Sequence, residues 1–283
     1  MKVGFWVAPE GAEEAVTLAK IGGDDALADT RRINFLATRS AEELIARCPS
    51  VAGLLPRVAD ALAAQKASAP ARLFDITDLP ADDRELLSQL LGAGEVAGVA
   101  ALTDGVVAQI QESVLAGLWR VRFTDEGGAC IADYLEIAAI PQAVRKAAEL
   151  ARTIIDIGVP PADAMNVMPL LAEIRARRAA HRPGDPPHVI NFSLLPVNEA
   201  DMQFLQQTLG DGPVRLVSRG YGSCRVHATG VRNVWSVQFF NAMDAIILDT
   251  LEIGDPPLAA CAADEDFHDS AERLREIHEA YFQ

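Results

Sequence analysis

Cysteine and histidine side chains in the second half of the chain have the types, and in part the spacing, of metal ligands. Two residues separate Cys224 from His227, and Cys261 with His268 could complete a four-ligand set. Zinc sites usually close with two tight pairs such as C-x-x-C, and strand residues three apart point to opposite faces. We therefore expect no bound cofactor. Metal or iron–sulfur carriage through Cys224 and Cys261 is the alternative hypothesis.

Catalytic motifs are absent from the sequence. It contains no G-x-S-x-G, H-E-x-x-H or Rossmann glycine pattern. The stretches GAGE (92–95) and GDGP (210–213) follow predicted helices, so they indicate turns and not phosphate loops. A lone cysteine is more often a small buried apolar residue than a nucleophile. We therefore expect a protein that is not an enzyme.

The stretch SRGYGSCR, from Ser218 to Arg225, joins two predicted strands. Its two glycines would let the backbone approach a ligand or a partner closely. A tight hairpin that carries Cys224 incidentally explains the same pattern. Both interpretations stay open at this point.

The elements that must position these side chains occur twice. The series LLPRVADALAAQ, LFDITDLP, ELLSQLLGAGEV, GLWRVRF and DYLEI recurs from Leu170 as LLAEIRARRAAH, VINFSLLP, QFLQQTLGDGPV, NVWSVQFF and DTLEI. The offset is 116 residues and widens to 118 only at Gly92/Gly210. A long unit present only twice indicates an internal duplication and not a solenoid. Residues present in one copy only are then candidates for function.

Each copy follows one plan of helix, strand, helix, antiparallel β-meander and closing helix, which predicts an α+β fold of two pseudo-equivalent domains. Apolar alternation in W-x-V-x-F places Trp119 and Trp235 on the core faces of strands. Glu136 and Glu252 end the next strand of each copy, where we expect them to bond to neighbouring backbone.

The repeat also predicts domain boundaries. We expect an N-terminal segment at 1–49, domain 1 at 50–156, a linker at 157–166 and domain 2 at 167–283. The first segment should contain a strand at 1–7 and a helix that begins at Ser40. The closing helices are expected over 144–155 in the first copy and from about 258 in the second.

Composition limits the classes of partner. Half of the 283 residues are apolar, enough for a sizeable core, and the net charge is −15. This charge repels phosphate backbones and anionic lipid, so we expect no nucleic-acid binding. No apolar run reaches bilayer-spanning length, and the N-terminus lacks the pattern of a secretory signal. We expect a cytoplasmic protein without membrane insertion.

Long motifs in both copies resemble the HupH/HyaF/HoxQ hydrogenase expression proteins. In the second copy these are NFSLLP and the stretch from LGDGPVRLVSRGYGSCR to AERLREI; in the first they are LGAGEV, IQESVLAGLWRVR and YLEIAAIP. The resemblance covers residues 51–280 and implies an accessory chaperone for nickel–iron hydrogenase maturation. By this resemblance, the partners would be the small-subunit precursor, bound before export, and a thioredoxin-like accessory protein.

The resemblance and the residues confined to the second copy together define candidates for partner binding. The acidic segment that follows Cys261 would suit a cationic partner segment. The candidate residues are Arg219, Gly220, Tyr221, Gly222, Cys224, Arg232, Asn233, Trp235, Glu252 and Cys261.

Overall fold

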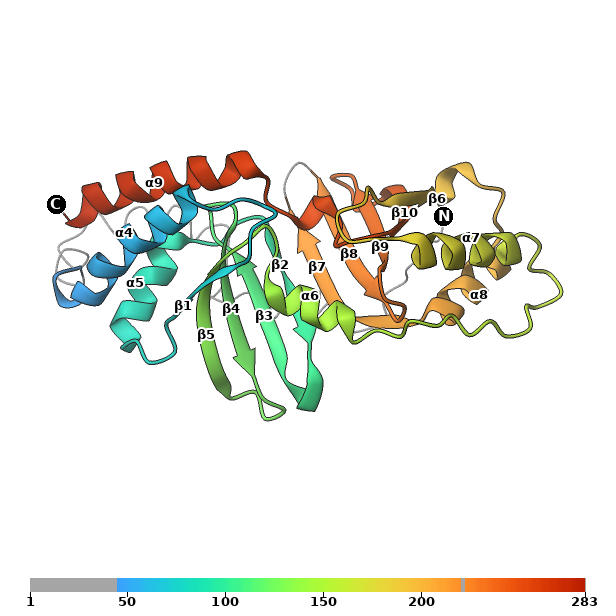
Figure 1. The fold of residues 1–283 in the computed structure, drawn as a ribbon, viewed down its shortest axis with the longest axis horizontal. Coiled ribbons are helices and arrows are strands. Elements are labelled where there is room, and N and C mark those ends of the chain that lie inside the picture. The colour runs from blue at the N-terminus through green and yellow to red at the C-terminus, as the bar shows by residue number, and fades with distance from the viewer. Residues whose placement is uncertain (1–44, 220–221, 283) are drawn as a thin grey trace. The chain divides into compact units, whose positions relative to one another are not determined.

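The computed structural model describes residues 45–219 and 222–282. Helices are combined with antiparallel strands throughout this part of the chain, which confirms the α+β class (Figure 1). The strand predicted at 1–7, the start of the helix predicted from Ser40, and Gly220 and Tyr221 lie outside the described residues.

The element bounds follow the predicted plan in both copies. The helices are α4 (Pro49–Ala63), α5 (Ala81–Leu91), α6 (Gln142–Glu149), α7 (Val167–Ala180), α8 (Glu199–Leu209) and α9 (Asp264–Phe282), with short 3-10 turns η1 (Thr103–Gly105), η2 (Phe192–Leu194) and η3 (Leu258–Ala260). The strands are β1 (Arg72–Asp75), β2 (Val96–Ala101), β3 (Val107–Glu112), β4 (Leu118–Thr124), β5 (Cys130–Ile137), β6 (His188–Asn191), β7 (Asp211–Ser218), β8 (Ser223–Thr229), β9 (Val234–Phe240) and β10 (Ile246–Ile253).

The described residues form two compact units, each assembled from separate stretches of chain. The first-copy unit contains residues 45–97, 106–142 and 262–282. The second-copy unit contains 98–105, 143–219 and 222–261. Neither unit is one continuous segment, so compact units and sequence copies have different boundaries.

In the first-copy unit, β1, β5, β4 and β3 pair in that order, all antiparallel. Helix α4 turns one apolar face to the core, with Val51, Leu55, Val58 and Leu62 at helical spacing and fully buried. Helix α5 ends at Leu91, as predicted, and Gly92 follows with a φ of 58°.

In the second-copy unit, β7, β8, β9, β10 and β6 pair in that order, again antiparallel. Its apolar core joins α7 and α8 to β10 and to the segment after α6, through Leu171, Leu205, Leu251 and Ile155. An Asn198–Asp201 capping box starts α8.

Equivalent residues of the two copies make equivalent pairings. Arg72 pairs with Ile137 between β1 and β5, and His188 pairs with Ile253 between β6 and β10, which is the same register displaced by 116 residues. The indole N–H of Trp119 donates to the carbonyl of Ala138 at 2.8 Å, and that of Trp235 donates to Gly254 at 3.3 Å. Both tryptophans are buried, as the alternation predicts.

The C-terminal helix differs from expectation, because α9 packs on α4 and belongs to the first-copy unit. Figure 1 shows the two helices side by side. Arg275 of α9 donates to the Asp60 carboxylate of α4 at 3.2 Å, and His278 contacts the Ala52 carbonyl at 3.2 Å. The apolar stripe of α9 therefore completes the core of the other copy.

The helix predicted over 144–155 also ends early, at Glu149. Beyond it, the backbone of Arg152 pairs with the turn around Val231: its N–H donates to the Gly230 carbonyl and its carbonyl accepts the Arg232 N–H. The Arg152 guanidinium donates to the terminal carbonyls of α8, at Thr208 and Leu209. Pairing with the second copy replaces the helical hydrogen bonds.

We predict that Gly117→Ala destabilises the first-copy unit by more than about 2 kcal/mol. Gly117 has a φ of 80°, and an added Cβ would lie 2.4 Å from the Phe267 ring. Thermal unfolding, followed by tryptophan fluorescence, measures the effect. The control Gly53→Ala adds a methyl group at an exposed position of α4, where nothing lies within 4 Å, and should stabilise the protein by about 0.5–1 kcal/mol. Equal melting temperatures for the two variants would contradict this account.

Candidate functional site

The predicted hairpin joins β7 to β8. Arg219 is exposed at its start, and Gly222 has a φ of 90°, where a Cβ would meet the Phe240 carbonyl at 3.0 Å. The Arg225 guanidinium lies 4.4 Å from the centre of the Phe240 ring, which favours a cation–π contact. The hairpin therefore presents an arginine at its start, while glycine is required where the backbone runs close to β9.

Cys224 is buried on β8, with 6% of its surface exposed. Burial, with a smaller effect from the charge of Glu252, raises the pKa of its thiol to about 12. A thiol with this pKa stays protonated at neutral pH and is a poor nucleophile. Cys224 therefore packs as a small apolar residue.

The four possible metal ligands are not brought together. Cys224 and His227 alternate to opposite faces of β8, and His268 lies exposed on α9 of the other unit, 3.4 Å from Glu272. The Cys261 thiol is half-buried and donates to the Pro257 carbonyl at 3.4 Å. Within the described residues, no group of three or more His, Cys, Asp or Glu side chains has an arrangement that could hold a metal ion.

His227 is buried in the second-copy unit. Burial and the nearby charges of Arg215 and Arg225 lower its pKa to about 4. The imidazole is therefore neutral at physiological pH.

The second-copy residue Arg232 holds the segment after α6 in place, and Asn233 forms the adjacent turn. The Arg232 guanidinium donates to the Glu149 carbonyl at the end of α6. Asn233 has a φ of 62° at the position equivalent to Gly117, and its carbonyl accepts the Gly254 N–H at 2.9 Å. Asparagine tolerates this left-handed conformation better than most residues. Trp235 is 2% exposed, so it stabilises the core and offers no surface to a partner.

The repeated glutamates end equivalent strands in different surroundings. The Glu136 carboxylate accepts the Gln142 N–H at 2.7 Å and thereby holds the start of α6, which confirms the expected backbone contact. Burial raises the pKa of Glu252.

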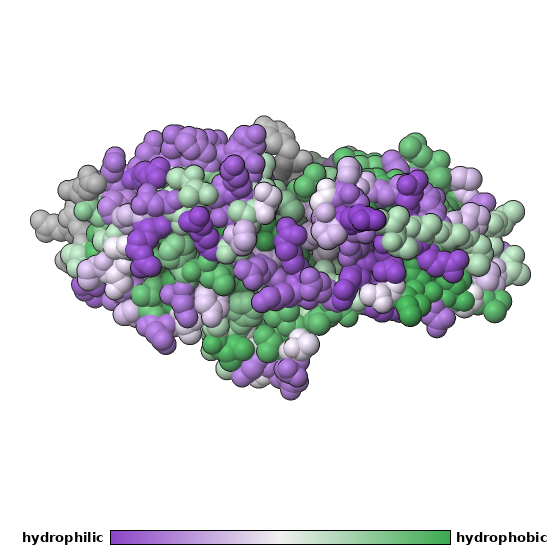
Figure 2. All heavy atoms as spheres, in the orientation of Figure 1, coloured by the Kyte–Doolittle hydropathy of each residue, from purple (hydrophilic) through white to green (hydrophobic). Residues whose placement is uncertain are grey.

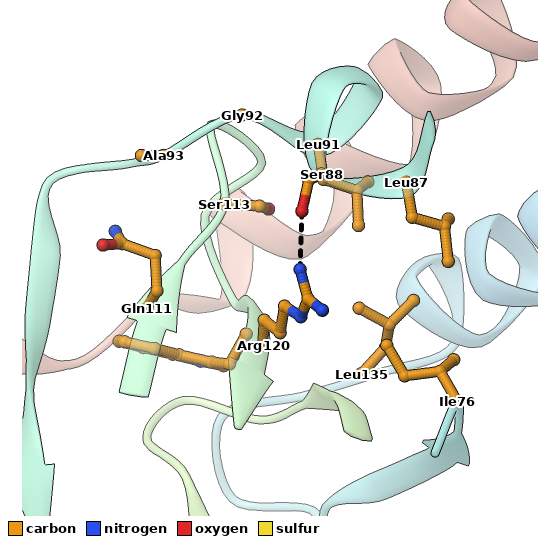
Figure 3. Close-up of a pocket in the computed structure, with 11 residues that line it drawn as sticks. Ile76, Leu87, Ser88, Leu91, Gly92, Ala93, Gln111, Ser113, Arg120 and Leu135 are labelled. Atoms are coloured by element: carbon orange, nitrogen blue, oxygen red, sulfur yellow. Dashed lines mark hydrogen bonds between the residues drawn. The ribbon is translucent and has the colours of Figure 1, made fainter. Parts of the chain in front are cut away.

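A charged cluster in the first-copy unit was not predicted from the sequence. The Arg120 guanidinium makes two bonds to Asp133, at 3.1 and 2.7 Å, and a third to the Ser88 hydroxyl of α5. Arg120 lines a cavity of about 40 Å³ together with Gln111 and Leu135. Such a volume suits water rather than an organic ligand. Figure 3 shows these side chains and the hydrogen bond from Arg120 to Ser88. Asp133 pairs across the strands with Arg122, and Arg120 is its diagonal neighbour, so the alternation of arginines on this strand was the signal that could have revealed the ion pair.

Acidic side chains form one exposed stripe along α9, opposite its buried face. Figure 2 shows hydrophilic residues along this helix. The stripe contains Glu265, Asp269, Glu272, Glu276 and Glu279, while Phe267, Ser270, Ala271 and Leu274 are buried.

In the described part of the chain, no helix has the length and apolar character needed to cross a bilayer.

Comparison with known proteins identifies the family. The C-terminal conserved region of the HupH hydrogenase expression proteins matches residues 50–153 and 164–281. The chain belongs to the HupH family. The HupH protein of Rhizobium leguminosarum bv. viciae is 63% identical over 283 residues, which is the whole of both chains. The predicted resemblance is confirmed, and the two matched stretches correspond to the two sequence copies.

More distant members of the HupH family align over most of their length. The hydrogenase expression/formation protein HupQ of Azotobacter chroococcum mcd 1 is 44% identical over 82% of each chain. The hydrogenase-1 operon protein HyaF of Escherichia coli K12 is 35% identical over 88% of this chain and 87% of its own. A solved HupH structure from Thiobacillus denitrificans aligns with 24% identity and a TM-score of 0.37, over 39% of this chain and 92% of its own.

We predict that Cys224 reacts with iodoacetamide at pH 8 at least on the order of 100-fold more slowly than the exposed Cys130, because burial keeps its thiol protonated. Mass spectrometry of the labelled peptides measures both rates in one sample. In denaturant the two rates should converge. Equal rates in the folded protein would show that Cys224 is an accessible, reactive thiol.

Proposed function

We propose that this protein is a non-enzymatic accessory factor in the maturation of nickel–iron hydrogenases and binds the immature small, iron–sulfur subunit in the cytoplasm before export. The observation that carries the proposal is full-length similarity to a protein named for hydrogenase expression and formation, at 63% identity. A thioredoxin-like accessory protein is the second partner that we propose.

The chemistry of the described residues favours binding over catalysis. Cys224 is buried with a raised pKa, and Arg232 and Trp235 are engaged in internal contacts. The cavity beside Arg120 is too small for an organic substrate. A partner would therefore bind to exposed side chains on the surface.

The acidic stripe of α9 is the surface that best fits a cationic partner segment. Its five carboxylates lie on one exposed helix face, and the whole chain carries a net charge of −15. Such a surface accelerates encounter with a basic segment and excludes acidic competitors. Arg219, at the exposed start of the β7–β8 hairpin, is a further contact in this proposal.

We also infer that the two copies arose by internal duplication. The shared strand register and the equivalent tryptophan hydrogen bonds support this origin. Duplication explains why the HupH conserved region matches the chain in two separate stretches.

Reversing the charge of the α9 stripe should weaken partner binding. In a pull-down with purified small-subunit precursor, we expect Glu265→Lys, Asp269→Lys and Glu276→Lys together to reduce affinity by about 10-fold or more, and added salt to weaken wild-type binding. The matched control reverses three exposed carboxylates elsewhere, Asp78, Glu126 and Asp163. No binding by the wild-type protein would refute the proposed function, and equal losses in both triple variants would refute the role of α9.

Metal analysis discriminates between a chaperone and a metal or iron–sulfur carrier. We expect anaerobically purified protein to contain far less than one equivalent of iron, nickel or zinc, and Cys224→Ser with Cys261→Ser to leave precursor binding unchanged. Stoichiometric metal that disappears in the double variant would establish the carrier function instead.

A further inference from the structure

The N-terminal part of α9 packs in a socket formed by the loop between β3 and β4, residues 113–117. The Phe267 ring is 1% exposed and lies against Gly117. The Ser270 hydroxyl donates to the Ala116 carbonyl at 2.9 Å, and Arg273 donates to the Val114 carbonyl at 3.2 Å. These contacts belong to one unit and fix the helix where its apolar stripe begins.

A buried carboxylate lies beneath this socket. Glu112 ends β3, is 7% exposed, and accepts the N–H of Gly117 at 3.2 Å. Its cross-strand neighbour is the buried Trp119. The equivalent residue of the second copy, opposite Trp235, is Ala228. The fold therefore does not require a carboxylate at this position, and Glu112 is a feature of the copy that receives α9.

The charged groups that act on Glu112 are both acidic. Asp266 comes from the first turn of α9, and Glu95 comes from the segment before β2. Burial is the largest effect, and together with these charges it raises the pKa of Glu112 to about 7, against the opposing effect of the Gly117 and Val96 backbone N–H groups. The docked helix thus adds a negative charge near the buried carboxylate.

We propose that the α9 socket is a proton-linked latch, held closed when Glu112 carries a proton and loosened when Glu112 is ionised. Releasing α9 would return the carboxylate to water and separate it from Asp266. It would also expose Phe267 and Leu274, which are buried against the first-copy unit. The latch is independent of the proposed hydrogenase function, since it depends only on contacts within this chain.

The direction of the pH effect follows from linkage. The docked state binds the Glu112 proton more tightly than the released state, in which the pKa returns towards its ordinary value of 4.5. The stability of docking is therefore fully present below pH 4.5, falls as the pH rises through about 7, and is constant at higher pH. The shift corresponds to a loss in the docking equilibrium on the order of 100-fold.

Hydrogen exchange of the full-length protein tests the latch. We expect the protection factors of α9 amides, corrected for intrinsic exchange rates, to fall on the order of 100-fold between pH 5 and pH 8. Amides of α7, in the other unit, serve as an internal reference and should not follow this dependence. In Glu112→Gln the α9 protection should be independent of pH, as it should in Glu112→Ala, which copies the second-copy residue. Glu126→Gln, at an exposed turn, should behave as wild type.

Two results would overturn the latch. One is α9 protection that does not change with pH in the wild-type protein, and the other is an unchanged pH dependence in folded Glu112→Gln. If neither Glu112 variant folds, Asp266→Asn supplies the test, because removing this charge lowers the pKa of Glu112. The midpoint of α9 release should then move to lower pH, and an unmoved midpoint would also overturn the proposal.

Discussion

The turn before the tryptophan strand is the feature on which both units depend, because in each unit it contacts the closing segment of the other copy. In the first-copy unit, Val114 and Ala116 accept hydrogen bonds from α9. At the equivalent turn of the second-copy unit, Gly230 and Arg232 pair with the backbone of Arg152. Both turns need a left-handed residue, Gly117 in one and Asn233 in the other. An equivalent turn thus binds a helix in one unit and an extended segment in the other.

Sequence periodicity predicts which residues are buried, but not which element buries them. Three sets of predictions are confirmed. Helices α5 and α8 end at Leu91 and Leu209, α7 has the predicted start and end, and both tryptophans lie in the core. The exchange of closing segments could not be predicted, because the apolar stripe of Phe267 and Leu274 would look the same in the sequence whichever of the two units α9 packed on. Only the contacts with α4 decide between them.

Several residues that differ between the copies have structural contacts. Arg232 and Asn233 occur in the second copy only, yet they fix the Arg152 segment and the left-handed turn, so their specialisation is structural. Cys224 is likewise a buried apolar residue. Glu112 differs from its counterpart Ala228 in the second copy, and it is a buried acid with a raised pKa. The motif search on the sequence did not single it out.

Exchange of the closing segments is the central claim, and removal of residues 264–283 tests it most directly. Hydrogen exchange of the shortened chain should show loss of protection in α4, whose apolar face α9 covers, and retained protection in α7 and α8. Loss of protection in α7 and α8 with α4 unaffected is the result expected of two continuous tandem domains, and it would contradict the account.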